Sequence, residues 1–249
     1  MMTHFASHGY HTLGTGKIMH SRDRQEWMEY GHPSDYGPFV FNGKDKIPNL
    51  DVPTPFRNDF GIIDGNFGPL EKVSDRVSPQ TGKPYSWVTG GWRDQREMKY
   101  ESDDNRDPTG DELNALWAVK RLKELSSLNQ QKPFFMGVGF VRPHTPLIVP
   151  QKYFDQFPLE LIQLPKIKKN DAHDTFKRTV TSIEDDRSGD RGTKMYDSLI
   201  ASFNGDRELA LKKFIQAYLA SVASVDDLVG EILEALEQTG LDKNTIVVF

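Results

Sequence analysis

The sequence predicts an α/β fold with a mostly parallel central sheet, flanking helices and long loop insertions. The helical pattern of residues 111–125 runs directly into the apolar stretch KPFFMGVGFV at 132–141. A second long helical pattern, from residue 211, runs into the apolar stretch TIVVF at 245–249. Because a continuous apolar run is typical of a strand buried on both faces, each helix–strand pair predicts half of a βαβ unit.

A shorter strand is expected near the start of the chain. After the end of a helix, GYHTLGTGK at residues 9–17 combines β-forming residues with a glycine-rich exit. This strand and the run at 132–141 are the two that we expect to place functional loops.

The best-formed unit begins at the DELNALWAVKRLKEL segment. Asp111 and Glu112 lie where acidic residues favour a helix start, and the following apolar residues recur at helical spacing: Leu113, Leu116, Trp117, Val119 and Leu122. The preceding stretch, 103–114, resembles the start of a calcium loop, but it has Pro108 in place of the turn glycine and Asn114 in place of the bidentate glutamate. We interpret it as a turn that leads into a helix cap.

The last unit predicts one buried stripe on a helix or a pair of helices. Its apolar positions, starting from Leu211, are Ile215, Tyr218, Val222, Val225, Val229, Ile232 and Leu236. Gly240 lies where a helix-terminating glycine is expected. The NTIVVF segment then predicts another buried strand, in which the sequence stops at Phe249. A terminal carboxylate among buried apolar groups is costly, so we expect the chain to be a fragment or one half of a split gene.

Two zones lack clear periodicity, residues 21–110 and 155–204. They are expected to be loop-rich insertions that select the substrate. Trp27, Trp87 and Trp92 could pin the first zone onto the body of the protein or form a wall of the substrate site. The charge-rich stretch 166–191 is expected to be a solvated surface excursion.

Composition excludes several function classes. A net charge of −5 is unlike a nucleic-acid-binding domain, and no run of about 18 apolar residues is present to span a membrane. The first residues show neither the basic nor the apolar region of a signal peptide. The absence of cysteine excludes disulfides, thiolate zinc sites and a cysteine nucleophile within this chain.

Two basic segments follow the predicted strands at 9–17 and 132–141. GTGKIMH (14–20) supplies Lys17 and His20, and VRPHTP (141–146) supplies Arg142 and His144. Ligands of open α/β sheets bind beyond the carboxyl ends of the strands, so both segments are expected to face one crevice. Lysine offers a point charge and histidine a proton near neutral pH, which suits a tetrahedral oxyanion such as sulfate or phosphate. Ordinary surface residues are the alternative interpretation.

Three blocks resemble the sulfatase family of the alkaline-phosphatase-like superfamily, most closely its iduronate-2-sulfatase branch. They are GYHTLGTGKIMH, KPFFMGVGFVRPHTPLIVPQKYFDQFPLE and YLASVASVDDLVGEILEALEQTGLDKNTIVVF, in the family's order. The resemblance implies an incomplete alkaline-phosphatase/sulfatase-like sandwich. Residues 1–249 would be a partial catalytic domain truncated at both ends, with 21–110 and 155–204 as insertions.

The resemblance also implies an activity and residue roles. The family hydrolyses sulfate esters, here of a sulfated small molecule or saccharide, with calcium and a formylglycine made from cysteine. Lys17 would bind the sulfate and the nucleophile region, His20 would orient or deprotonate the formylglycine diol, and His144 would contact a sulfate oxygen near the leaving group. Arg142 matches only a basic position, so its implied role in substrate binding is weaker.

The sequence departs from the family pattern in its catalytic motifs. The Cys-x-Pro-Ser-Arg motif, the first acidic metal pair and the later Ser-Asp-His-Gly segment are all missing from it. We therefore expect no metal ligands in this chain, a supply of neither calcium nor formylglycine, and no activity of the isolated chain. Full-length relatives are usually exported to the periplasm, the exterior or the lysosome, but the compartment of this chain stays open. A phosphonate-, phosphate-ester or choline-sulfate hydrolase and a non-catalytic remnant are the alternatives.

Overall fold

The computed structural model describes residues 1–20, 23–90, 95–127, 132–166 and 191–249. Its helices are α1 (Met2–Ser7), α2 (Phe56–Asp64), α3 (Gly110–Ser126), α4 (Gln151–Phe154), α5 (Arg191–Ser202) and α6 (Arg207–Gln238), with short 3-10 turns η1 (Asp23–Glu26), η2 (Leu159–Leu161) and η3 (Leu241–Asn244). Its strands are β1 (His11–Gly16), β2 (Glu29–Pro33), β3 (Phe39–Phe41), β4 (Lys46–Ile47), β5 (Phe67–Leu70), β6 (Ser86–Thr89), β7 (Arg96–Met98), β8 (Tyr100–Ser102), β9 (Asn105–Arg106), β10 (Phe134–Gly139) and β11 (Leu147–Pro150).

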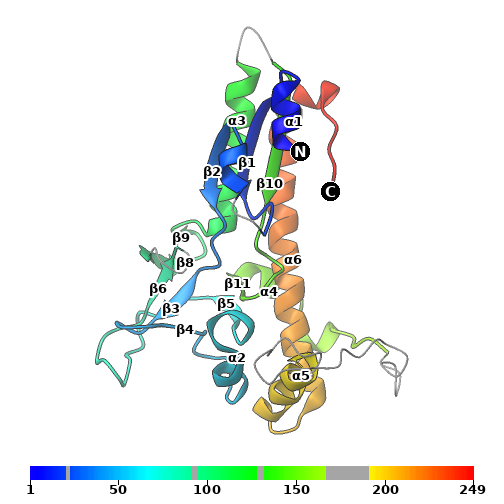
Figure 1. The fold of residues 1–249 in the computed structure, drawn as a ribbon. Coiled ribbons are helices and arrows are strands. Elements are labelled where there is room, and N and C mark those ends of the chain that lie inside the picture. Colours follow the sequence, from blue (N-terminus) through cyan, green and yellow to red (C-terminus); the bar gives the residue numbers. More distant parts are fainter. Residues whose placement is uncertain (21–22, 91–94, 128–131, 167–190) are drawn as a thin grey trace, which may run out of the picture.

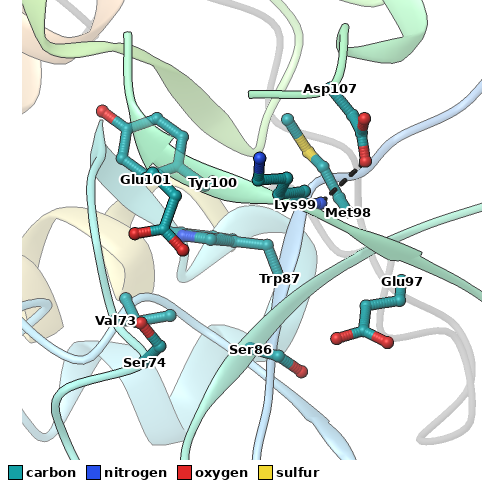
Figure 2. A pocket seen from close by; sticks show the side chains of 10 residues that line it. All are labelled: Val73, Ser74, Ser86, Trp87, Glu97, Met98, Lys99, Tyr100, Glu101 and Asp107. Carbon is teal, nitrogen blue, oxygen red and sulfur yellow. Dashed lines mark hydrogen bonds between the residues drawn. The ribbon is translucent and has the colours of Figure 1, made fainter. Parts of the chain in front are cut away.

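A parallel sheet of order β10–β1–β2 carries the predicted site segments. β1 pairs with β10 along its whole length, from His11 opposite Phe134 to Gly16 opposite Gly139. Helices α3 and α6 run alongside these strands (Figure 1). The predicted α/β class, with parallel strands and flanking helices, is confirmed.

Helix α3 begins one residue before the predicted start. Thr109 and Glu112 form a capping box, in which each side chain bonds to the other residue's backbone amide. The interpretation of 103–114 as a turn leading into a cap is therefore confirmed. The predicted apolar face is wrong at Leu116, which is 51% exposed, because the helix buries a narrower face that includes Ala115 and Ala118.

Helix α6 is one continuous helix of 32 residues. The predicted stripe is wrong at Tyr218 and Val222, which are 46% and 41% exposed. The buried face consists largely of small residues: Ala210, Ala217, Ala220, Ser221, Ser224, Leu228, Ala235 and Leu236. Small side chains let a helix approach its neighbours closely, and their weak apolar signal explains the missed face. Gly240 follows the helix in the left-handed conformation, as predicted.

The predicted buried strand at 245–249 is not formed. Ile246, Val248 and Phe249 are 90%, 84% and 92% exposed, and within the described ranges no strand pairs with this segment. A strand needs a hydrogen-bonding partner, and an apolar sequence alone does not supply one.

Residues 21–110 contain more regular structure than the sequence predicted. An antiparallel sheet of order β4–β3–β6–β7 lies beside a β8–β9 hairpin, and β5 pairs in parallel with β11. The strands have two to five residues, too few for a clear alternation. Trp27 and Trp87 are buried, which favours the pinning role, whereas Trp92 lies outside the described residues.

The core of the lower half in Figure 1 joins α2, α5 and α6 to the β5–β11 pair. Residues 155–204 contribute η2 and α5 to this half, and the charged stretch 166–191 falls almost wholly outside the described residues. No helix among the described residues has the length and apolar character needed to cross a membrane.

Candidate functional site

The exits of β1 and β10 touch through their backbones. The amide of Lys17 donates to the carbonyl of Gly139 over 3.0 Å. A Cβ on Gly16 would lie 1.8 Å from that carbonyl oxygen, and a Cβ on Gly139 would lie 2.2 Å from the Lys17 carbonyl. Gly16 also has a φ of +79°, which side-chain-bearing residues rarely adopt. The glycines at the two exits therefore allow the two predicted loops to leave the sheet side by side.

A second glycine pair lies two residues earlier in β1 and β10. Gly14 and Gly137 are register partners, and the Trp27 ring covers both, with a Cβ at either position 2.7 Å from the indole. The same indole is stacked with Phe135 at 5.7 Å between ring centroids. The Trp27 ring thus packs against both strands of the pair.

Lys17 and His144 meet on one aromatic ring. The Nζ atom of Lys17 lies 5.0 Å from the centroid of the Tyr36 ring. The His144 imidazole meets the same ring edge-to-face, with 5.3 Å between centroids and an interplanar angle of 89°. The two loops therefore lie close together at Tyr36, and the expectation that they face one crevice stays a prediction.

The imidazole of His144 is oriented by the backbone next to it. Nδ1 lies 2.7 Å from the Thr145 carbonyl, which can only accept, so Nδ1 carries a hydrogen and Nε2 stays available for a ligand. The Thr145 hydroxyl donates to Asp64, which also pairs with Arg191 at 2.7 Å. Burial alone raises the pKa of Asp64, but the Thr145 and Arg191 hydrogen bonds and the Arg191 charge bring it below its ordinary value.

The Arg142 side chain is buried and links several backbone segments, although His144, two residues later, is exposed. Its guanidinium donates to the carbonyls of Gly37 at 2.7 Å and Ile148 at 3.2 Å and lies 3.7 Å from an Asp111 oxygen. Asp111 in turn accepts from the amides of Val141 and Arg142. Burial raises the pKa of Asp111 and lowers the pKa of Arg142, each opposed by the partner's charge. These contacts fix the VRPH loop, and the predicted role in substrate binding stays a prediction.

A second buried carboxylate fixes the loop that carries Tyr36. Asp35 accepts from the amides of Gly37 at 2.8 Å and Gly90 at 2.6 Å. A Cβ on Gly110, at the start of α3, would lie 2.7 Å from the Asp35 Cβ. The turn around Tyr36 is therefore held between β6 and α3.

His20 lies three residues beyond Lys17 and is exposed, next to residues 21–22, which are not described. The described contacts do not join it to Lys17, Tyr36 or His144. Its predicted role stays a prediction.

The comparisons with known proteins decide the family. A family model described as Sulfatase matches residues 1–249. The chain belongs to the sulfatase family. It is 32% identical over 249 residues to a protein named Sulfatase from Formosa agariphila, covering 98% of this chain and 39% of that protein.

Other relatives carry more specific names. An Arylsulfatase from Clostridium perfringens is 29% identical over 165 residues, which cover 66% of this chain and 28% of that protein. An Iduronate 2-sulfatase from Mus musculus is 28% identical over 142 residues, which cover 53% of this chain and 23% of that protein. The resemblance drawn from the sequence is confirmed, and the chain spans well under half the length of these relatives.

The described residues do not fit the cofactors expected of a sulfatase. Across the described ranges, no three His, Cys, Asp or Glu side chains gather in a way that could hold a metal ion. The sequence has no cysteine from which formylglycine could be made.

Tyr36, which contacts both Lys17 and His144, was not among the candidate residues predicted from the sequence. It follows β2, the third strand of the parallel sheet, whose carboxyl end opens at the same edge as those of β1 and β10. The usable signal was the turn SDYGP after EYGHP, but the latter was not recognised as a strand.

Proposed function

We propose that this chain carries the sulfate-binding part of a sulfate-ester hydrolase site. In this proposal, Lys17 and His144 bind the sulfate group of the substrate. The main support is that both side chains follow paired parallel strands and contact the ring of Tyr36. This arrangement would put two nitrogen donors beside one tetrahedral anion.

The chemistry assigns each group a separate task. The Lys17 ammonium would neutralise sulfate charge. The Nε2 atom of His144 would donate to a sulfate oxygen when protonated, and would pass that proton toward the leaving oxygen of the ester. His20 would face the nucleophile of a complete sulfatase site, for which this sequence has no cysteine. Arg142 would support the loop that presents His144.

The substrate proposed is a sulfated saccharide. Its support is the family assignment together with the name of the iduronate 2-sulfatase relative. The aromatic and polar segments of residues 21–110 and 155–204 would select among such saccharides. Residues 1–249 would be part of the catalytic domain.

The isolated 249-residue chain is proposed to turn over no sulfate ester. The sequence lacks a cysteine-derived nucleophile, and uncatalysed water attack on an aryl sulfate is slow. Purified protein incubated with a chromogenic aryl sulfate should release no more phenol than buffer does. Release that scales with protein concentration and is lost in Lys17→Met would overturn this part of the proposal.

The anion site is tested by binding inorganic sulfate to the full chain, followed through the His144 ring signals in NMR spectra. Lys17→Met should weaken sulfate binding about 10-fold or more, since a charge-assisted hydrogen bond is lost. Lys120→Met, which removes an exposed lysine on α3, is the matched control and should leave affinity unchanged. Phosphate is titrated alongside as the competing anion.

Two outcomes would contradict the proposed site. Equal sulfate affinity in Lys17→Met and the parent chain would remove Lys17 from it. Phosphate binding at least 10-fold tighter than sulfate at equal ionic strength would favour a phosphate-ester hydrolase instead.

A further inference from the structure

We infer that Tyr36 is a positioning residue of the anion site, whose ring sets the places of the Lys17 ammonium and the His144 imidazole. This inference rests on the proposed function, because it concerns the same site. Neither the sequence pattern nor the family match assigned a role to Tyr36.

The two contacts with the Tyr36 ring have different geometries. The Lys17 ammonium lies over the ring at 5.0 Å, where the negative face of the π system attracts a cation. The His144 ring stands perpendicular to Tyr36 at 5.3 Å, a distance and angle typical of a favourable edge-to-face pair. Because both side chains contact the same ring, the position of Tyr36 determines the place of each relative to the other.

The ring can act this way because its backbone is fixed on both sides. Asp35, immediately before it, is buried and accepts two backbone hydrogen bonds. Gly37, immediately after it, donates one of them and also accepts from the Arg142 guanidinium. The buried groups therefore fix the backbone on both sides of a partly exposed ring.

The same buried arginine connects the ring to the loop of His144. Arg142 lies two residues before His144, and its backbone amide is held by Asp111. The Tyr36 turn and the His144 loop are thus joined by one guanidinium. A shift of either loop would be transmitted to the other, which keeps the ring and the imidazole in register.

The phenol hydroxyl is not needed for this role. Within the described ranges, no hydrogen bond of the Tyr36 hydroxyl is found, and the ring contacts alone connect it to Lys17 and His144. Phenylalanine at this position would keep both ring contacts. Leucine would remove the aromatic ring but keep an apolar side chain. The pair of variants therefore separates the ring from the hydroxyl.

The experiment uses the full 249-residue chain, inorganic sulfate as the probe, and the ring signals of His144 and of the exposed His8 in NMR spectra. Tyr36→Leu should weaken sulfate binding about 2- to 5-fold, the equivalent of one cation–π contact at a partly exposed site. It should also remove the ring-current shift of the His144 signals and leave those of His8 in place. Tyr36→Phe should match the parent chain in both readouts.

The outcomes separate this inference from the proposed function. If the parent chain binds sulfate and Lys17→Met weakens it, but Tyr36→Leu leaves affinity and His144 shifts unchanged, the positioning role is wrong and the anion site stands. If Tyr36→Phe weakens binding as much as Tyr36→Leu, the hydroxyl contacts the anion and the ring role is wrong. If the parent chain binds no sulfate, the proposed site itself fails. Circular dichroism and thermal melting of Tyr36→Leu check that a loss of binding is not a loss of fold.

Discussion

The parallel sheet and the antiparallel sheet of this sulfatase-family chain are held together in different ways. At the exits of β1 and β10, glycine backbones approach so closely that one added carbon atom would overlap a carbonyl oxygen. The β3–β6–β7 sheet is instead packed by large side chains, among them Trp87 and Met98. Backbone contacts tolerate no added atom, whereas side-chain packing can adjust in part. The loops of the candidate site are therefore carried by the less tolerant of the two regions.

The largest effect is expected where the two regions meet, at Arg142. Its guanidinium joins the β10 exit to the Gly37 carbonyl, just before β3. Arg142→Met would leave the Asp111 carboxylate buried without its charge partner, which should lower the free energy of unfolding by about 3–5 kcal/mol. Urea unfolding followed by circular dichroism measures the change.

The matched control is Arg76→Met. The Arg76 side chain is 45% exposed and lies 3.1 Å from the exposed Asp51 carboxylate, so its removal should cost less than about 1 kcal/mol. Equal losses in the two variants would show that the burial of Arg142 does not set its contribution.

A smaller effect, confined to the parallel region, is expected from Gly16→Ala. The added methyl would meet the Gly139 carbonyl, in addition to the cost of a left-handed backbone, so we expect a loss of more than about 2 kcal/mol. Gly82→Ala is the comparison, because Gly82 has a similar φ of +69° but its Cβ would meet open space. It should cost about 1 kcal/mol. If the two variants lose equal stability in the same urea series, the strand exits are not in close contact.

The smallest effect is expected beside the antiparallel region, at Glu71. Burial, together with the nearby Asp51 carboxyl, raises the pKa of Glu71 to about 7 from its ordinary value of 4.5. The folded state then binds more protons than the unfolded state between these values, so stability should fall as pH rises from about 4.5 to about 7. Glu71→Gln should remove that part of the fall.

Melting temperatures at pH 5 and pH 8 measure this difference. The parent chain should lose more stability between the two pH values than Glu71→Gln does. Glu160→Gln, on the 3-10 turn η2, is the control and should behave as the parent. An identical pH dependence in all three proteins would contradict the raised pKa.

The sequence was most informative where strands are long and glycine-rich. It predicted the strand before Lys17, the strand before Arg142 and the helix between residues 111 and 125, because apolar runs and caps are local signals. It could not predict the burial of Arg142 or the exposure of His144, since that difference depends on Asp111 and Gly37, far away in the chain.

The errors in predicting strands have a common physical origin. Short strands such as β3 form because neighbouring strands pair with them, and residues 245–249 stay unpaired because no partner strand lies beside them in the described structure. Propensity cannot report the presence of a partner. Tyr36 was missed for the same reason, because its place depends on β2 joining the parallel sheet.

The Trp27 indole covers Gly14 and Gly137, so these three positions, distant in the sequence, constrain one another's substitutions. A methyl at either glycine would lie 2.7 Å from the indole, so each substitution is acceptable only after the aromatic side chain has become smaller. The order of mutations then matters, because a larger residue at position 14 or 137 is tolerated only after Trp27 has been replaced. Among natural variants of this chain, small-to-larger changes at positions 14 and 137 should accompany loss of the tryptophan, and combinatorial mutagenesis should find the three positions strongly epistatic.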